Sequence, residues 1–110
     1  MRKKKITVNI DTTYKYVQLW NGIFDLTNKE LSILSSFIDV NNITEEVNIC
    51  SVKNKKQVAN MVGIKDYNTL NNYVKSFKDK GVMLKNDNIY VLNPFLEPDT
   101  DIVEININKI

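Results

Sequence analysis

Residues 58–83 place the tightest limit on the fold of this chain, because apolar side chains recur there at helical spacing on both sides of a glycine. The stretch reads VANMVGIKDYNTLNNYVKSFKDKGVM. The apolar side chains of its second half recur every three or four residues, at Leu70, Tyr73, Val74 and Phe77. This spacing predicts an amphipathic helix over residues 68–80, and Gly63 and Gly81 can end the two helices in the left-handed conformation at little cost. The pattern therefore predicts two short helices joined by a tight turn.

A further helix is predicted upstream, in the stretch LTNKELSILSSFIDV. Thr27 can accept a hydrogen bond from the backbone at the third helical position while Glu30 reaches back, which is a capping box. The apolar residues that follow form a stripe that faces a core: Leu31, Ile33, Leu34, Phe37 and Ile38. The next segment, EVNICSV (residues 46–52), predicts a short apolar strand with Cys50 buried. Asn54 is then expected to cap the following helix.

Two hairpins are predicted on either side of these helices. VMLKNDNIYVLNP predicts two strands around a tight turn. Upstream, YKYVQLWNGIFDL predicts a hairpin, since Asn21 and Gly22 can supply the positive φ angles of a two-residue turn. Near the two ends of the chain, ITVNI (residues 6–10) and IVEINI (residues 102–107) carry alternating apolar and polar residues. These two strands are expected to pair within one molecule or across a dimer.

The elements together predict an α+β fold of three helices and a hairpin, with an added N-terminal β-hairpin and a C-terminal strand. A chain of 110 residues can bury one modest core, so we expect a single domain over residues 1–110. Its parts are expected to be N-terminal strands over 1–26, a helical core with its hairpin over 27–94, and a C-terminal tail or strand over 95–110.

The composition excludes several classes of site. The chain has no histidine and a single cysteine, which rules out a Cys/His zinc site, an internal disulfide and a Ser-His-Asp triad. Acidic residues such as Glu45, Glu46, Asp99 and Asp101 lie in expected loops without convergent bases, and there is no glycine-rich phosphate loop. We therefore expect no enzyme, no catalytic residue, no metal and no cofactor. No apolar run approaches the roughly 20 residues of a membrane span, and the start MRKKKITVNID lacks the apolar segment of a signal peptide. We therefore expect a cytoplasmic protein with no membrane contact.

Charge is distributed unevenly, although the net charge is only +2. Residues 53–85 contain eight lysines and two aspartates, a net charge of +6, while the remainder carries −4. A basic segment in an otherwise acidic chain indicates a surface that faces nucleic acid. The alternative is a solvated face in a lysine-rich chain. The basic residues 2–5 are either an arm for the phosphate backbone or a solubilising start.

The order helix, short strand, helix, turn, helix, hairpin resembles the winged helix-turn-helix fold. In QVANMVGI…NTLNNYVKSFKDKGVM, as in the bacterial regulator pattern, Ala59 lies four residues before the turn glycine and a Thr-Leu-x-x-Tyr-Val helix ends in Lys-Gly-aliphatic. LWNGIFDLTNKELSIL is also similar to response-regulator effector domains, and IYVLNP to winged helices of phage and plasmid replication and regulatory proteins. The motif covers residues 53–94, and its turn IKDYN is about one residue longer than the usual pattern.

The resemblance implies a non-enzymatic protein that binds double-stranded DNA, either a small transcriptional regulator or a replication accessory protein. Its third helix, about 68–80, is expected in the major groove, and its wing, 85–88, on the DNA backbone. The residues expected to contact DNA are Lys53, Lys55, Lys56, Tyr67, Asn68, Thr69, Asn71, Asn72, Lys75, Lys78, Lys85, Asn86 and Asn88. Asparagine can contact adenine with two hydrogen bonds, and lysine contacts guanine or phosphate. Each asparagine can equally be an exposed residue of an Asn-rich chain, and the segment has no arginine for guanine.

The alternative is a winged helix used for protein contact, for example in a phage particle or on a polymerase, because a fold does not dictate its function. The acidic remainder and the additional terminal strands favour this reading, and an exposed IVEINI edge could accept a partner's strand. For DNA binding we expect a homodimer, because one recognition helix alone rarely gives enough affinity. The terminal strands are its candidate interface.

Overall fold

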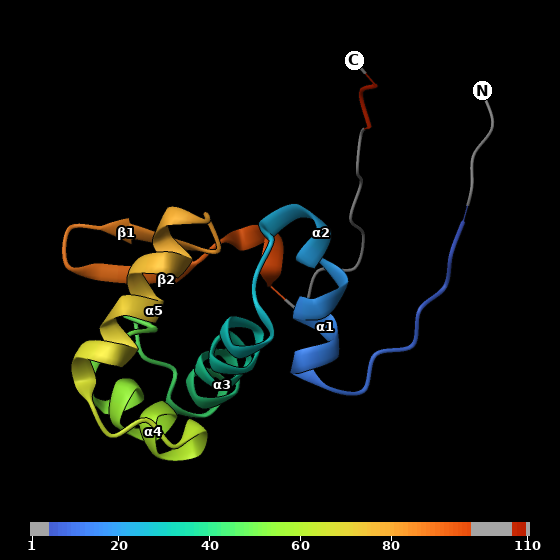
Figure 1. The fold of residues 1–110 in the computed structure, drawn as a ribbon. Coiled ribbons are helices and arrows are strands. Elements are labelled where there is room, and N and C mark those ends of the chain that lie inside the picture. Colours follow the sequence, from blue (N-terminus) through green and yellow to red (C-terminus); the bar gives the residue numbers. More distant parts are fainter. Residues whose placement is uncertain (1–4, 98–106, 110) are drawn as a thin grey trace.

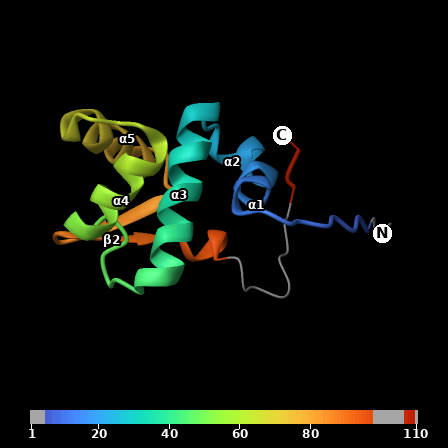
Figure 2. The ribbon, with the colours of Figure 1, turned by 90° about the horizontal axis from the view of Figure 1, so that it is seen from below.

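The computed structural model of the chain describes residues 5–97 and 107–109 (Figure 1). These residues form an α+β structure of helices and one antiparallel hairpin. In chain order the elements are α1 (Thr13–Leu19), α2 (Asn21–Phe24), α3 (Asn28–Thr44), α4 (Val52–Val62), α5 (Tyr67–Asp79), β1 (Met83–Asn86), β2 (Ile89–Leu92) and the 3-10 helix η1 (Pro94–Leu96). Helix α3 runs through the middle, with α4, α5 and the hairpin on one side and α1 and α2 on the other (Figures 1 and 2).

Helix α3 begins at the capping box that the sequence predicts. The hydroxyl of Thr27 accepts from the backbone N–H of Glu30 at 3.1 Å, and the Thr27 N–H donates to the Glu30 carboxylate at 2.9 Å. The predicted apolar stripe is confirmed, since all five of its side chains are buried: Leu31, Ile33, Leu34, Phe37 and Ile38. The local cap sets where the helix starts, and the stripe sets which face is buried.

The predicted pair of helices around Gly63 is confirmed. Gly63 has φ 72° and ends α4, and the N–H of Ile64 donates to the Ala59 carbonyl at 2.9 Å. Helix α5 starts at Tyr67, within one residue of the prediction. The predicted cap of α4 is wrong. Ser51 accepts from the N–H of Asn54, and the Asn54 side chain is buried.

The downstream hairpin is confirmed, with Leu84 opposite Val91 and Asn86 opposite Ile89. The strand predicted over 46–52 is wrong, because this segment forms bends and turns before α4 starts. The amide oxygen of Asn48 accepts from the N–H groups of both Cys50 and Tyr90 at 3.0 Å, which turns the chain. One ladder-like bond to β2 remains, from the N–H of Ile49 to the carbonyl of Tyr90 at 3.0 Å.

The predicted N-terminal hairpin is wrong, because residues 13–24 form α1 and α2. Thr12 caps α1 by accepting from the backbone of Lys15, and Val17 on its inner side is 2% exposed. Asn21, expected in a type I′ turn, instead starts α2. Its side chain binds both the N–H and the carbonyl of Leu26, at 2.6 and 3.0 Å. Packing against α3 therefore outweighs the strand preference of the aromatic and β-branched residues.

The predicted terminal strands are not seen as paired strands among the described residues. Residues 5–10 have no strand pairing with the described residues of the same chain, and their pairing across a dimer stays a prediction. The predicted C-terminal strand, 102–107, falls outside the described residues except for Ile107, which lies in irregular chain and is 80% exposed. Of the basic residues 2–5, Arg2, Lys3 and Lys4 are outside them as well, and Lys5 is described and exposed.

One core unites the described elements. Val17 from α1 and Leu26 before α3 belong to the same buried cluster as Phe77 from α5 and Leu96 from η1. The N-terminal helices are thus part of the packed body, and the partly buried aromatic rings of Trp20, Phe24 and Phe95, among others, pack against its edge.

Candidate nucleic-acid interface

The residues predicted to contact DNA lie at one end of the molecule. Helices α4 and α5 and the hairpin gather there, while α1, α2 and the described terminal segments lie at the other end (Figures 1 and 2). Three predicted residues lie on the first turns of α4: Lys53, Lys55 and Lys56. Seven lie on α5: Tyr67, Asn68, Thr69, Asn71, Asn72, Lys75 and Lys78. Three lie at the tip of the hairpin, Lys85 and Asn86 at the end of β1 and Asn88 in the turn. All are exposed except Lys55, which is partly buried.

Helix α5 has one buried side and one polar side. Leu70, Val74 and Phe77 are at most 3% exposed and fix the helix on the core. At about 3.6 residues per turn, Asn68, Asn72 and Lys75 fall on the opposite side and Asn71 and Lys78 on one flank. We call the exposed residues Asn68, Asn71, Asn72, Lys75 and Lys78 the α5 face.

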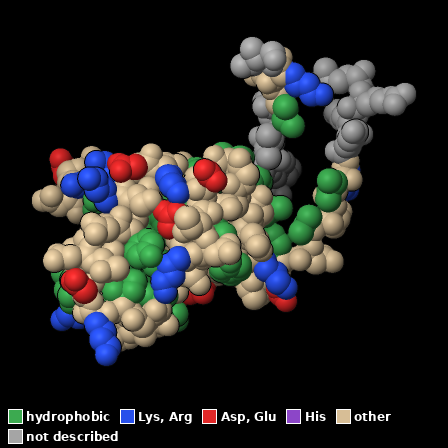
Figure 3. Space-filling model, in the orientation of Figure 1, with side chains coloured by type: hydrophobic (Ala, Val, Ile, Leu, Met, Phe, Trp, Pro, Cys, Tyr) green, Lys and Arg blue, Asp and Glu red, His purple; other side chains and the backbone are tan. Residues whose placement is uncertain are grey.

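Two aspartates bound the α5 face. Asp66 caps the helix, and its carboxylate accepts from the backbone of Asn68 at 2.9 Å. Asp79 is the last helical residue and is exposed. On the face of the molecule in Figure 3, basic and acidic side chains are interspersed and do not merge into one basic patch. The uneven charge along the sequence is therefore not reproduced as a basic patch on this face.

An open groove beside α4 holds two of the predicted residues. Lys56 and Tyr67 line it together with Ala59, Asn60, Ile64 and Lys65. Sequence reasoning missed Asn60 and Lys65 as candidates for contact. Lys65 lay within the basic segment, which was the available signal, whereas nothing in the sequence distinguished Asn60 from the other asparagines.

A second groove lies between α5 and the start of α3. Thr69 and Asn72 line it with Tyr73, Ser76, Thr27 and Glu30. These two predicted residues therefore border a buried carboxylate, while Asn71 and Lys78 lie on the other flank of α5. The α5 residues predicted to contact DNA are therefore divided between two sides of the helix. The sequence alone did not predict this division.

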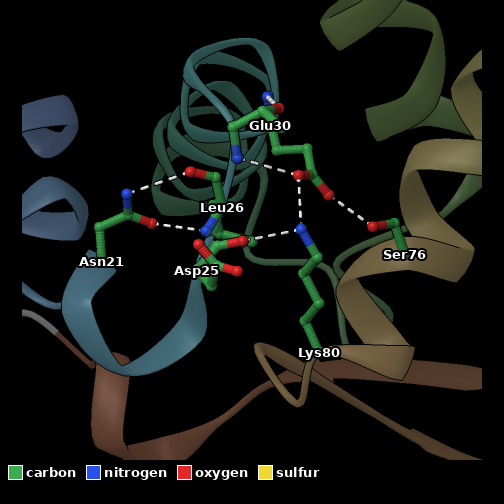
Figure 4. Close-up of polar contacts among 7 residues, drawn as sticks. Asn21, Asp25, Leu26, Glu30, Ser76 and Lys80 are labelled. Carbon is green, nitrogen blue, oxygen red and sulfur yellow. Dashed lines mark hydrogen bonds and ion pairs between the residues drawn. The ribbon is translucent and has the colours of Figure 1, made fainter.

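The Glu30 carboxylate anchors α5 to α3 (Figure 4). Glu30 is 5% exposed and accepts from the ammonium of Lys80 at 2.8 Å and from the Ser76 hydroxyl. Burial alone would raise the Glu30 pKa, but the hydrogen bonds from Lys80, Ser76 and Thr27 and the charge of Lys80 lower it to about 2. Lys80 also donates to the carbonyl of Asp25 at 2.8 Å. Although Lys80 belongs to the basic segment, its charge is therefore paired within the protein.

A buried asparagine holds the entrance to α4. Asn54 is fully buried and donates to the side chain of Asn41 and the carbonyl of Ile49, both at 2.9 Å, and its oxygen accepts from Thr44 at 2.8 Å. All these groups are paired, so the network fixes the end of α3 against the start of α4. The lysines of α4 are carried on this rigid base.

Cys50 is a packing residue in this arrangement. Its sulfur lies 3.5 Å from that of Met83, and burial raises the pKa of its thiol to about 12. A thiol in this state is a poor nucleophile at neutral pH. Within the described residues, no three or more His, Cys, Asp and Glu side chains come together as metal ligands.

The hairpin turn presents the remaining predicted residues. The Lys85 ammonium lies 5.7 Å from the centre of the Tyr90 ring, and the Asn88 carbonyl accepts from Asn48 at 3.4 Å. The first contact lies within the hairpin, and the second connects its turn to the loop before α4.

No family model, curated protein or solved structure matches the chain. Among the residues that the structure describes, no helix has the length and apolar character to cross a bilayer.

Proposed function

We propose that this chain is a winged helix-turn-helix protein that binds double-stranded DNA without catalysing a reaction, as a small transcriptional regulator or a replication accessory protein. The order α3, α4, α5 and hairpin supports this fold. The bond from Ile49 to Tyr90 brings the loop before α4 alongside β2, where the fold has its short first strand. Gly63 supplies the tight turn between α4 and α5.

The observation that carries the proposal is the exposed α5 face, flanked at the same end of the molecule by the lysines of α4 and of the hairpin turn. In the proposed complex α5 enters the major groove, where Asn68, Asn71 and Asn72 read base edges. Lysines at the start of α4 meet phosphate, aided by the helix dipole. Lys85 and its neighbours contact the backbone beside the groove.

The test is binding to labelled duplex DNA at low and rising salt, measured by fluorescence anisotropy. Lys75→Ala or Lys85→Ala should weaken binding across all sequences and lower the salt slope by about 1 each. Asn71→Ala or Asn72→Ala should alter sequence preference instead. Lys15→Ala is the matched control, because Lys15 is an exposed lysine on α1 at the far end of the molecule. A folded protein without duplex affinity at low salt would contradict the proposal.

A second candidate function is binding of another protein. The hairpin favours it, since Leu84, Ile89 and Val91 are 44%, 40% and 38% exposed on one uncharged face. The aspartates at both ends of the α5 face would also repel phosphate. This candidate predicts that the double variant Leu84→Ser, Val91→Ser keeps its fold and associates more weakly with a protein partner. It also predicts that the parent protein does not bind duplex DNA.

A further inference from the structure

The segment from Lys5 to Asp11 has the sequence pattern of a strand but is irregular, unpaired chain in the structure. Its apolar residues alternate with polar ones, and Ile6, Val8 and Ile10 are 85%, 53% and 37% exposed. Within the described part of the chain, no backbone hydrogen bond joins residues 5–11 to other residues. Their N–H and C=O groups and one apolar row are therefore available to another strand.

The sequence of this segment is complementary to itself in one arrangement. When two copies run antiparallel with Val8 opposite Val8, Ile6 lies opposite Ile10 and Lys5 opposite Asp11. Opposite charges directly across a ladder are favourable, as are pairs of β-branched side chains. A parallel arrangement in register would instead place Lys5 against Lys5 and Asp11 against Asp11. Charge thus favours the antiparallel over the parallel arrangement, and only the register centred on Val8 aligns the three apolar residues of both copies with one another.

We propose that residues 5–11 of two copies of this chain pair as antiparallel strands centred on Val8 and form a homodimer. A two-stranded ribbon needs its apolar face covered to be stable. Leu19 and Ile23 are 47% and 57% exposed on α1 and α2, at the same end of the molecule as this segment (Figure 1), and they supply apolar surface for that purpose. The inference concerns only assembly and does not depend on DNA binding.

Disulfide trapping in the full chain tests the register directly. In the proposed pairing the two Val8 residues are directly opposite, within the distance that a disulfide spans. Val8→Cys should therefore form a covalent dimer under mild oxidation, seen on a non-reducing gel. Thr7→Cys is the control, because Thr7 lies opposite Asn9 and two Thr7 residues are about 8 Å apart. The native Cys50 is buried and gives little background.

Charge exchange gives a second, independent test by sedimentation equilibrium. The parent protein should show twice the monomer mass of 12.8 kDa. Lys5→Asp or Asp11→Lys should each weaken the dimer about tenfold, because each places like charges at two symmetric positions. The double variant should recover it, and an equimolar mixture of the two single variants should form the mixed dimer. Lys5 and Asp11 are exposed, and the ion pair of Asp11 with Lys15 at 2.9 Å is exposed too and contributes little to stability, so the changes should leave the fold intact.

Several results would overturn the proposal. One is a parent protein that stays monomeric at every concentration, and another is equal trapping at positions 7 and 8. A dimer insensitive to the charge exchanges but lost when residues 102–110 are deleted would assign the interface to the C-terminal segment instead.

Discussion

Glu30 is ionised although it is buried, because its two carboxylate oxygens accept hydrogen bonds from three residues. The backbone of Thr27 holds it at the start of α3, while Ser76 and Lys80 reach it from the end of α5. Such a group stabilises the fold only while it is charged. Since the Glu30 pKa is lowered from 4.5 to about 2, stability is present above pH 4.5 and is lost as the pH falls toward 2.

Glu30→Gln should reveal this dependence in urea unfolding at different pH values. At pH 7 the variant should be less stable by on the order of 2–3 kcal/mol, because Lys80 loses its counter-ion. The difference from the parent protein should shrink between pH 4.5 and 2, where the parent carboxylate becomes protonated. Asp79→Asn, at an exposed carboxylate, is the control. A difference that stays constant down to pH 2.5 would contradict this account.

Asn54 acts at the same scale through hydrogen bonds without charge. Replacing it by alanine removes three side-chain bonds and leaves the Ile49 carbonyl and the Asn41 and Thr44 side chains without this partner. We expect a loss of about 2–4 kcal/mol in unfolding free energy. Gln57→Ala, at an exposed site of the same helix, should change it by less than about 0.5 kcal/mol. Equal effects of the two substitutions would show that the buried network contributes little.

At the scale of the element, the turn between α4 and α5 depends on one backbone conformation. Gly63 has φ 72°, and a Cβ atom added there would meet no atom within 4 Å. Substitution is therefore opposed by the conformation and not by a clash. Gly63→Ala should cost about 1–2 kcal/mol in thermal or urea unfolding, and Gly63→Asn should cost less, since asparagine tolerates the left-handed region. Equal costs for the two would point to a cause other than backbone conformation.

The elements differ in how far local sequence decides them. Helix α3 carries its own start signal and a long apolar stripe, and α5 carries its own spacing. The start of α3 and both ends of α5 are therefore predicted to within one residue, whereas α3 runs on to Thr44, four residues beyond the predicted stretch. The segment YKYVQLWNGIF contains residues that favour strands, and Asn-Gly favours a hairpin turn. It forms helices because Val17 can then enter the core on α3 and Asn21 can hold the backbone of Leu26.

At the scale of the molecule, aromatic rings join the N-terminal helices to the chain beyond the hairpin. The Trp20 ring lies 4.8 Å from that of Phe95, and Tyr16 donates from its hydroxyl to the Glu97 carbonyl at 3.1 Å. Trp20 is the only tryptophan. Its fluorescence therefore reports on the packing of α1 and α2 against η1.

We expect the molecule to unfold as one unit. Tryptophan fluorescence and far-ultraviolet circular dichroism should give coincident urea transitions, because both sides of α3 share a core. Phe95→Ala should lower the unfolding free energy by about 2–3 kcal/mol and shift the Trp20 emission. An early, separate fluorescence transition in the parent protein would show that the N-terminal helices are an independent unit.

The sequence by itself determined the elements whose signals are local: the capping box at Thr27, the turn at Gly63, the stripe of α5 and the hairpin turn. It also indicated which polar residues of α5 would be exposed, because burial of one helical side leaves the other free. Only the tertiary structure decided that residues 13–24 are helical and that α5 has flanks facing different grooves. It also decided that the Lys80 ammonium forms an ion pair with the Glu30 carboxylate. These outcomes depend on contacts between residues that are distant in the sequence. A local sequence pattern gives no information about the free energy of such contacts.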